Sequence, residues 1–402
     1  MKETRDRSSS RDRLFHIWII MWLAILAAGI FCAMRCLTEG LHVTNMDNRF
    51  VFALWIFVDL TIIALGAGAF FTGFLLYVLK REEVREVINA AVVVGFICYS
   101  GAIAVLVVDI GQPLRAWFTF WHPNVHSMLA EVTICITCYL MVLLLEYVPL
   151  ILRNRKLSSR PTLDRLGKRV HRLAFALAAI GAFLSFFHQG SLGGLYGVLD
   201  GRPFSFREGL AIWPSTFFLF ILSAVAVGPS FLLLVTKASC AISGRRLASP
   251  RTYDFLGRLS GRLLAVYVCA KAIDTIVWAN DTVLESGLHA SEFYGEAAYG
   301  TWLLVAEILV FGAVPAFMLL RPKIRRDGRL LVLAASMACF GIALNRYAQT
   351  LQTLAVPTLP GEGFAVYVPN ANEVAIALGV VAYGVLVFSL SFRYLPLYPK
   401  NT

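Results

Sequence analysis

The residues best suited to chemistry form one short segment, His188-Gln-Gly-Ser-Leu-Gly-Gly-Leu-Tyr-Gly197. It follows an apolar stretch that predicts a helix from Arg172 to Phe187, so we expect the imidazole where that helix meets the edge of a membrane. Four glycines among small hydroxyl and amide groups would let a flat ligand approach the backbone beside a titratable ring. The alternative is a glycine-rich turn with an interfacial histidine, and the segment alone leaves both open.

A second polar segment is Asp109-Ile-Gly-Gln-Pro-Leu-Arg115. Its glycine and proline predict a sharp turn, across which Asp109 and Arg115 can form a salt bridge. The aromatic residues that follow are typical of an interfacial belt. If Asp109 instead lies beside His188 at the mouth of a pocket, it would tune the imidazole for proton exchange near neutral pH.

Other ionisable residues lie within apolar stretches, where a charge costs about 2.5–3.5 kcal/mol on insertion scales. They are Asp59, Glu131, Lys271, Asp274, Glu307 and Arg346. Lys271 and Asp274 share a helix face and can neutralise one another, or Asp274 can pair with Arg346. One interpretation is a set of buried ion pairs that holds the helices together. The interpretation we favour is a polar pocket with a proton path to the outer surface.

The elements that must position these residues are membrane-spanning helices. Of the 402 residues, 58% are hydrophobic and 15% are charged, which is far from a soluble composition. Ten stretches are long enough to cross a bilayer: 15–36, 52–79, 87–109, 127–151, 170–188, 211–236, 259–281, 300–320, 330–352 and 373–395. The fold class is therefore an all-α integral membrane protein. We expect two four-helix bundles flanked by the first and last helices, with 52–188 and 211–352 as internal repeats.

Basic residues set the expected orientation. Of the 36 Lys and Arg residues, 29 fall in tails and loops on one side of the spans and 5 on the other. This imbalance predicts that both termini are cytoplasmic. We expect a basic tail over 1–14, one transmembrane domain over 15–396 and a short tail over 397–402. The net charge of +11 then reflects topology and contact with lipids, so we exclude nucleic acid as a partner.

With that orientation, nearly every embedded charge lies between the midplane and the outer surface. The inner half offers Glu146 and hydroxyls such as Tyr77 and Tyr139, so no complete proton path across the membrane is visible. Cys135 and Cys138 have the spacing of a metal or redox pair, but they lie in an apolar helix without basic neighbours, and we interpret them as packing. The cysteines are not clustered as an iron–sulfur site requires, and we expect no metal.

Several motifs together resemble one family. They are Asp109 to Arg115, His188 to Tyr196, Asn345-Arg-Tyr347, Val368 to Glu373 and Phe392 to Pro396. Over essentially the whole chain, the sequence resembles the NrfD/polysulfide-reductase membrane subunits, in their ten-helix HybB-like branch. Glycine stands at 190 and 194 where that family often has serine and threonine, and we expect this difference to widen the pocket.

The resemblance implies a multi-pass protein of the bacterial inner membrane, without haem or metal, that binds menaquinone or ubiquinone near the periplasmic side. It implies a docked ferredoxin-like iron–sulfur subunit and a further catalytic subunit: a hydrogenase, a molybdopterin enzyme or a multihaem cytochrome. The subunit is not expected to be active alone. The resemblance also implies that His188 and Asp109 carry out proton exchange. Gln189, Ser191, Gly193 and Arg115 complete the expected quinone pocket, above a charged floor of Lys271, Asp274 and Arg346.

Two other functions stay open at this point. A haem-containing cytochrome b anchor needs facing axial histidines, but His171 and His188 lie about 25 Å apart along one helix. A secondary transporter would use the buried charges for coupling ions, but the sequence lacks clear pairs of broken helices at the midplane.

Overall fold

The computed structural model describes residues 2–52, 54–124, 127–154, 157, 159–197, 215–285, 289–295, 300–355 and 362–399. Within them the chain is helical and has no strand, which confirms the all-α prediction. Among the described residues, ten helices are long and apolar enough to span a membrane: 12–39, 54–78, 88–109, 128–152, 174–195, 216–243, 250–281, 301–320, 328–351 and 371–394.

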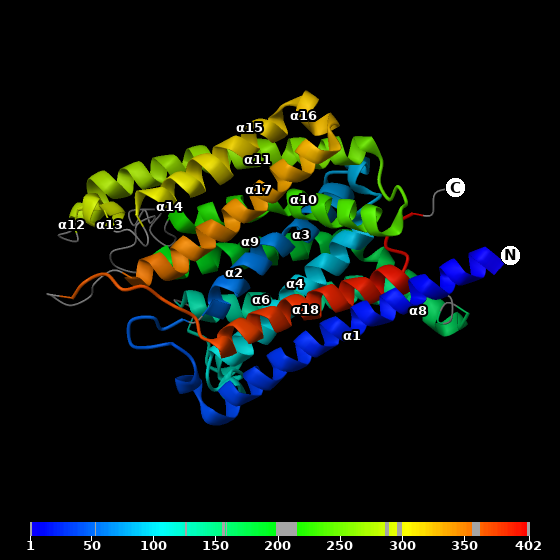
Figure 1. Cartoon of the computed structure of the whole chain (residues 1–402), viewed down its shortest axis with the longest axis horizontal. Coiled ribbons are helices and arrows are strands. Elements are labelled where there is room, and N and C mark those ends of the chain that lie inside the picture. The colour runs from blue at the N-terminus through cyan, green and yellow to red at the C-terminus, as the bar shows by residue number, and fades with distance from the viewer. Residues whose placement is uncertain are drawn as a thin grey trace.

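The spans are built from α-helices joined by short helical turns. The α-helices are α1 Lys2–Glu39, α2 Leu54–Gly66, α3 Gly68–Gly73, α4 Ile88–Asp109, α5 Phe118–Trp121, α6 Met128–Leu152, α8 Pro161–Arg172, α9 Ala174–Gly197, α10 Ser215–Ser243, α11 Pro250–Val277, α12 Val283–Glu285, α13 Ala290–Gly295, α14 Thr301–Val305, α15 Val314–Leu320, α16 Pro322–Arg326, α17 Gly328–Tyr347 and α18 Ala371–Tyr394. The helix α1 begins, and α18 ends, at the same end of the bundle (Figure 1).

Four spans contain π-helical segments, which are uncommon and often occur at functional sites. They are η2 Phe74–Val78, η5 Trp278–Thr282, η6 Ala306–Ala313 and η7 Ala348–Gln352. Glu307 lies in η6, Asp274 precedes η5 by one turn, and Arg346 lies two residues before η7. Three of the four segments therefore adjoin the embedded charges noted in the sequence.

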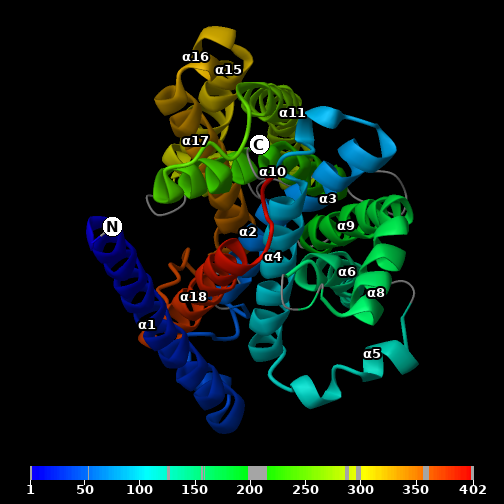
Figure 2. The same ribbon diagram turned by 90° about the vertical axis from the view of Figure 1, so that its right-hand side faces the viewer.

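The helices α1 and α18 form a pair at one side of the bundle (Figure 2). Their closest approach is at Gly29 and Gly379, where a Cβ added to Gly29 would lie 2.7 Å from the Gly379 Cα. The side of α1 that faces away from α18 is apolar and exposed, as expected for a helix in contact with lipid. Small residues therefore position the peripheral pair, because only glycine lets the two backbones come so close.

The remaining spans pack in chain order. The helices α2, α4, α6 and α9 contact one another in succession, and α10, α11, α15 and α17 do the same. The two groups meet where α10 packs against α9, α2 and α3. At that seam Gly68 and Gly228 touch, since a Cβ on Gly68 would lie 2.5 Å from the Gly228 backbone. The division into two repeated four-helix bundles stays a prediction.

One boundary differs from the sequence prediction in a way that matters for function. The span expected to end at His188 continues as α9 to Gly197. The glycine-rich segment is therefore helical, and His188 lies nine residues, or about 13 Å, before the end of α9. The prediction failed because glycine was taken to end the helix, whereas here it lets α9 pack closely against α10.

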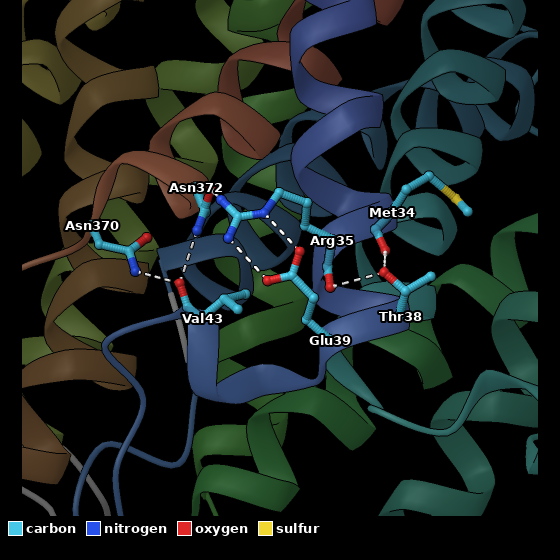
Figure 3. Close-up of polar contacts among 7 residues, drawn as sticks. All are labelled: Met34, Arg35, Thr38, Glu39, Val43, Asn370 and Asn372. Carbon is cyan, nitrogen blue, oxygen red and sulfur yellow. Dashed lines mark hydrogen bonds and ion pairs between the residues drawn. The ribbon is translucent and has the colours of Figure 1, made fainter.

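Amide and carboxylate side chains fasten the loop after α1 to the loop before α18. Figure 3 shows Asn370 and Asn372 directed at the same carbonyl, that of Val43, with Nδ2–O distances of 2.7 and 2.9 Å. Arg35 bonds the Asn372 side chain and forms an ion pair with Glu39 at 2.9 Å. These contacts hold the two loops together at the end of the bundle opposite the chain ends.

Candidate functional site

His188 is fully buried inside the bundle rather than placed at its rim. Its ring lies 5.8 Å from that of Tyr99 on α4. Neither ring nitrogen has a hydrogen-bond partner of good geometry among the described residues, and the Val132 carbonyl of α6 is the nearby acceptor. A buried polar group without a partner is rare in folded proteins and is expected where a ligand or a proton must bind.

Aromatic and hydroxyl side chains surround this imidazole. The Tyr99 hydroxyl and the Ser185 hydroxyl are 3.1 Å apart, and the Tyr99 ring packs on that of Tyr139 with centroids 4.2 Å apart. Gln189, next to His188, is buried, and neither polar atom of its amide makes a hydrogen bond of good geometry among the described residues, although the Tyr99 hydroxyl is near. The Tyr139 hydroxyl is also buried without a bond of good geometry, near the hydroxyls of Tyr99 and Ser185. Several helices thus bring donors and acceptors to one buried place.

Neighbouring helices fill the space beside the glycines that follow His188. A Cβ on Gly190 would lie 2.4 Å from the ring of Phe217, and one on Gly193 would lie 2.2 Å from the carbonyl oxygen of Thr216. The expectation that Gly190 widens a pocket is therefore wrong, because the Phe217 ring fills that space. Ser191 is buried, and its hydroxyl donates a hydrogen bond of 2.7 Å to the Phe187 carbonyl one turn back. This hydroxyl proton is therefore not free to bond a ligand.

The Asp109 carboxylate does not adjoin His188. Its Oδ1 accepts a hydrogen bond of 2.6 Å from the Trp55 indole of α2. Tyr99, which does contact His188, lies ten residues earlier on α4, or about 15 Å along the helix. Arg115 is exposed and forms no ion pair with Asp109. Of the two alternatives that the sequence left open for Asp109, the structure has neither the salt bridge with Arg115 nor a position beside His188, because the carboxylate bonds the Trp55 indole.

Asp59 lies one turn further along α2 than Trp55 and is fully buried. Neither carboxylate oxygen has a hydrogen-bond partner among the described residues. Asp109 lies within electrostatic range of it. Since α2 and α4 pack together, Asp59 lies deeper than Asp109, on the way toward the level of His188. An unpartnered carboxyl at this depth is costly and suggests a role in proton transfer.

A second polar cluster lies on α11, η6 and α17. The Lys271 ammonium is 3.8 Å from the Asp274 carboxylate, and both are buried. Of the two pairings left open by the sequence, the structure therefore has the one within α11. Glu307 lies within electrostatic range of both residues and of Arg346. Two cations thus balance two carboxylates in one buried cluster.

Arg346 is held by several partners. Its Nη1 donates to the Asn345 amide oxygen at 2.6 Å and its Nη2 donates to the Ser223 hydroxyl at 2.8 Å. The Asn345 amide nitrogen in turn donates to Glu307 at 2.7 Å. The guanidinium lies 3.7 Å from the centre of the Phe220 ring, in a cation–π contact. This arrangement fixes Arg346 firmly, as a structural or electrostatic anchor requires.

The helix α10 joins the two clusters. Phe220 contacts Arg346 on one side, and its Cβ lies 2.9 Å from where a side chain at Gly193 would begin. The His188 segment and the charged cluster are therefore separated by the thickness of one helix. A movement of α10 would therefore change the packing of both the His188 segment and the charged cluster.

Two of the sequence-predicted acids stay apart from these clusters. Glu131 is partly exposed near the start of α6, without an ion pair among the described residues. Glu146, toward the other end of α6, lines a cavity of about 40 Å³ together with Tyr77, Asn89 and Arg153. Such a volume holds water.

Several residues of the site were missed by sequence reasoning. Tyr99, Phe217 and Phe220 lie in uniformly apolar stretches, where nothing in the local pattern separates a site residue from a core residue. Glu373 could have been found, because it is an acid at the start of a span. It is fully buried and accepts hydrogen bonds from the backbone N–H of Asn45 at 2.7 Å and from the Tyr367 hydroxyl.

Metal binding is not indicated by the side chains that the structure describes. No group of three or more His, Cys, Asp or Glu in those ranges could hold an ion. All eight cysteines are free. Cys135 is buried and Cys138 is exposed on the same helix, and their interpretation as packing residues stays a prediction.

Comparison with known proteins identifies the family that the chain resembles. The family model described as "Polysulphide reductase, NrfD" matches residues 42–355. The "Menaquinone reductase, integral membrane subunit" of Nitratidesulfovibrio vulgaris is 48% identical over 96% of this chain and 93% of its own length.

More distant relatives have different catalytic partners in their names. The "Probable Ni/Fe-hydrogenase 2 b-type cytochrome subunit" of Escherichia coli is 27% identical over 89% of this chain and 86% of its own length. A selenate reductase subunit of Mesobacillus selenatarsenatis is 22% identical over 95% of this chain and 94% of its own length. The motif-based resemblance drawn from the sequence is thus confirmed.

Proposed function

The chain belongs to the polysulphide reductase NrfD family, and from that premise we propose that it is the quinone-interacting membrane subunit of a respiratory oxidoreductase complex. It exchanges electrons between menaquinone and an iron–sulfur subunit docked on the bundle, and protons between menaquinone and the water at the ends of the bundle. The observation that carries the proposal is the buried pair His188 and Gln189, whose side-chain polar atoms make no hydrogen bond of good geometry in the described structure. The name of the menaquinone reductase relative supports the choice of quinone.

The chemistry of a quinone suits these side chains. A quinone head group is flat and carries two carbonyl oxygens, and reduction to the quinol adds two electrons and two protons. His188 can donate a hydrogen bond to a quinone oxygen and deliver a proton to it. Gln189 can orient the second oxygen or the ring edge. The neighbouring rings of Tyr99 and Tyr139 offer apolar faces of the kind that line ligand sites.

Protons can reach the site from the end that carries Asp109. That carboxylate is partly exposed, and the deeper, unpartnered Asp59 lies within its electrostatic range. We assign both to proton exchange, with Asp59 added to the predicted pair of His188 and Asp109. Lys271, Asp274, Glu307 and Arg346 form the charged floor beyond α10 and set the electrostatic potential of the site.

A second route starts at the other end of the bundle. Glu146 lines the water-sized cavity, and Tyr139 lies seven residues away on the same face of α6. Tyr139 contacts Tyr99, which contacts His188. This series supports the proposal that protons for quinone reduction are drawn across the membrane, so that turnover contributes to proton translocation.

The orientation and partners complete the proposal. The charge imbalance favours cytoplasmic termini in the bacterial inner membrane, with the tails at 1–14 and 397–402 inside and the Asp109 end facing the periplasm. A ferredoxin-like iron–sulfur subunit then docks on the periplasmic loops and connects to a hydrogenase, molybdopterin or multihaem catalytic subunit. We propose no haem in this subunit. On its own it is not expected to turn over substrate.

A cytochrome b function is the second candidate, because the name of the Escherichia coli relative contains "b-type cytochrome". A bis-histidine haem needs a second imidazole opposite His188. The groups found around His188 are Tyr99 and the Val132 carbonyl, which do not fit that role. An absorbance spectrum of the purified subunit with a haem α-band would overturn the haem-free assignment.

Substrate uptake by the subunit in vesicles would favour a transporter.

The test of the proposed function is electron transfer to a menaquinone analogue by the complex purified through this chain. In the His188→Ala variant we expect turnover to fall by about 10²–10⁴-fold while the subunits still assemble. The matched control is His122→Ala, at an exposed histidine after α5. Normal turnover in His188→Ala, or an equal loss in both variants, would contradict the assignment.

A further inference from the structure

A basic cleft lies at the end of the bundle that carries the chain ends. It is formed by the end of α6 and by α8, close to the start of α9, and it has a volume of about 320 Å³. The side chains that matter here are Pro149, Leu152, Arg153, Asp164, Lys168 and Arg172. The cleft does not include His188, Asp109 or the charged cluster. It shares Pro149 and Arg153 with the Glu146 cavity, but the proposed proton route gives neither of these two residues a role.

The charges in this cleft favour an anion. Lys168 forms an ion pair of 2.6 Å with Asp164, one turn away on α8. Arg153 and Arg172 line the same cleft and form no ion pair within the part of the chain that the structure describes. The lining therefore has an excess of two positive charges. Two guanidinium groups and an ammonium that face one space form a geometry suited to a phosphate group.

The surroundings of the cleft favour a lipid over a soluble phosphate. Its floor includes the apolar Pro149 and Leu152. Beyond it, α6 exposes Met141 and Leu145, and α9 exposes Phe175 and Ile180. Apolar side chains on neighbouring membrane helices would contact an acyl chain whose head group occupied the cleft. Helix α8 lies beside α6 and α9 (Figure 2), so that its basic residues border the same surface.

We propose that this cleft binds the phosphodiester head group of an anionic phospholipid, with Arg153, Lys168 and Arg172 as the phosphate ligands and the acyl chains along α6 and α9. Basic pockets between transmembrane helices are a known way of recognising such head groups. The bound lipid would fasten α8 to the ends of α6 and α9. The site is independent of the quinone proposal and stands if that proposal fails.

The experiment measures which lipids stay bound to the purified full-length protein, with its co-purifying subunits. The protein is reconstituted into nanodiscs of phosphatidylcholine with 0 to 30% phosphatidylglycerol, a range on the order of that in anionic membranes, and retained lipid is counted by native mass spectrometry. We expect phosphatidylglycerol to be retained in preference to phosphatidylcholine. We expect the triple variant R153Q/K168Q/R172Q to weaken this retention roughly a hundredfold. Each lost charge contributes a factor of about ten or less to that decrease.

The matched control removes three exposed basic residues from other connections at the same end of the bundle, in R245Q/K323Q/R326Q. Equal loss of lipid in both triple variants would show general surface attraction and overturn the site. Inorganic phosphate that displaces the lipid or stabilises the protein as well as phosphatidylglycerol does would identify a soluble-anion site instead. If the triple variant does not fold, R153K/R172K keeps the charge and should retain most of the lipid, whereas R153Q/R172Q should not.

Discussion

Replacing Gly193 with alanine tests whether the His188 segment is a helix packed on α10. The added Cβ would lie 2.2 Å from the Thr216 carbonyl oxygen, and ordinary contact begins at 3.4 Å. The obstacle is backbone, so it cannot rotate away, and α9 and α10 must separate by about 1 Å. The hydrogen bond of 2.8 Å from the Thr216 hydroxyl to the Gly193 carbonyl would also be strained.

The magnitude follows from opposing terms. Overpacking costs about 1–3 kcal/mol and loss of the hydrogen bond about 0.5–1.5 kcal/mol. Exchanging glycine for alanine inside a helix stabilises the helix by about 1 kcal/mol. We therefore expect Gly193→Ala to lower the free energy of unfolding by about 0.5–3.5 kcal/mol. Because the displaced α9 carries His188, quinone turnover should fall as well.

The neighbouring Gly194 is the control. Its added Cβ would meet the Met128 sulfur at 3.2 Å, at the flexible end of a side chain. Gly194→Ala should therefore keep or raise stability, by up to about 1 kcal/mol. The assay is chemical unfolding of both variants in detergent, followed by turnover. If both substitutions stabilise the protein equally, the segment is not packed on α10 and the reasoning is refuted.

Three further predictions concern buried or clamped charges. Asp59→Asn should leave thermal stability unchanged or higher, because the carboxyl is unpartnered, while turnover drops about a hundredfold; a stability loss with normal turnover would make Asp59 structural. Arg346→Met should cost about 3–5 kcal/mol in chemical unfolding, and a cost near zero would show that its network is dispensable. At Glu86, partial burial would raise the pKa, but hydrogen bonds from Ser249 and Thr252 outweigh it and lower the pKa below the usual 4.5. The charged Glu86 should stabilise the fold fully at neutral pH, and this contribution should disappear as pH falls below about 4.5. The melting temperatures of wild type and Glu86→Gln should therefore differ at about pH 7 and converge in acid. A difference that stays constant with pH would contradict this.

The ten spans could be predicted because a membrane imposes a minimum length of apolar helix. Most span ends were located to within about five residues, but three were missed by seven to nine: the span predicted to end at 188 ends at 195, the one predicted to end at 236 ends at 243, and the one predicted to begin at 259 begins at 250. The end of α9 was missed, because a glycine in a membrane helix can either end it or allow a neighbour to approach. That choice depends on Thr216 and Phe217, which are far from the local pattern.

The site was predicted in part. The embedded charges were recognised because each is costly in lipid and needs a reason. Their grouping was not fixed by sequence: Asp109 bonds Trp55 instead of Arg115 or His188, and Asn345 links Arg346 to Glu307. Such pairings depend on the relative rotation and depth of helices far apart in the chain. The ring of Tyr99 beside His188 was not foreseen for the same reason.

The location of the bound quinone tests the central claim most directly. The complex would be labelled with a photoreactive menaquinone analogue, and the modified peptides identified by mass spectrometry. Labelling should fall on α9 around His188 and on the facing residues near Tyr99 and Val132, and excess unlabelled menaquinone should suppress it. Suppressible labelling confined to other helices, with none on α9, would contradict the claim that the buried His188 receives the quinone.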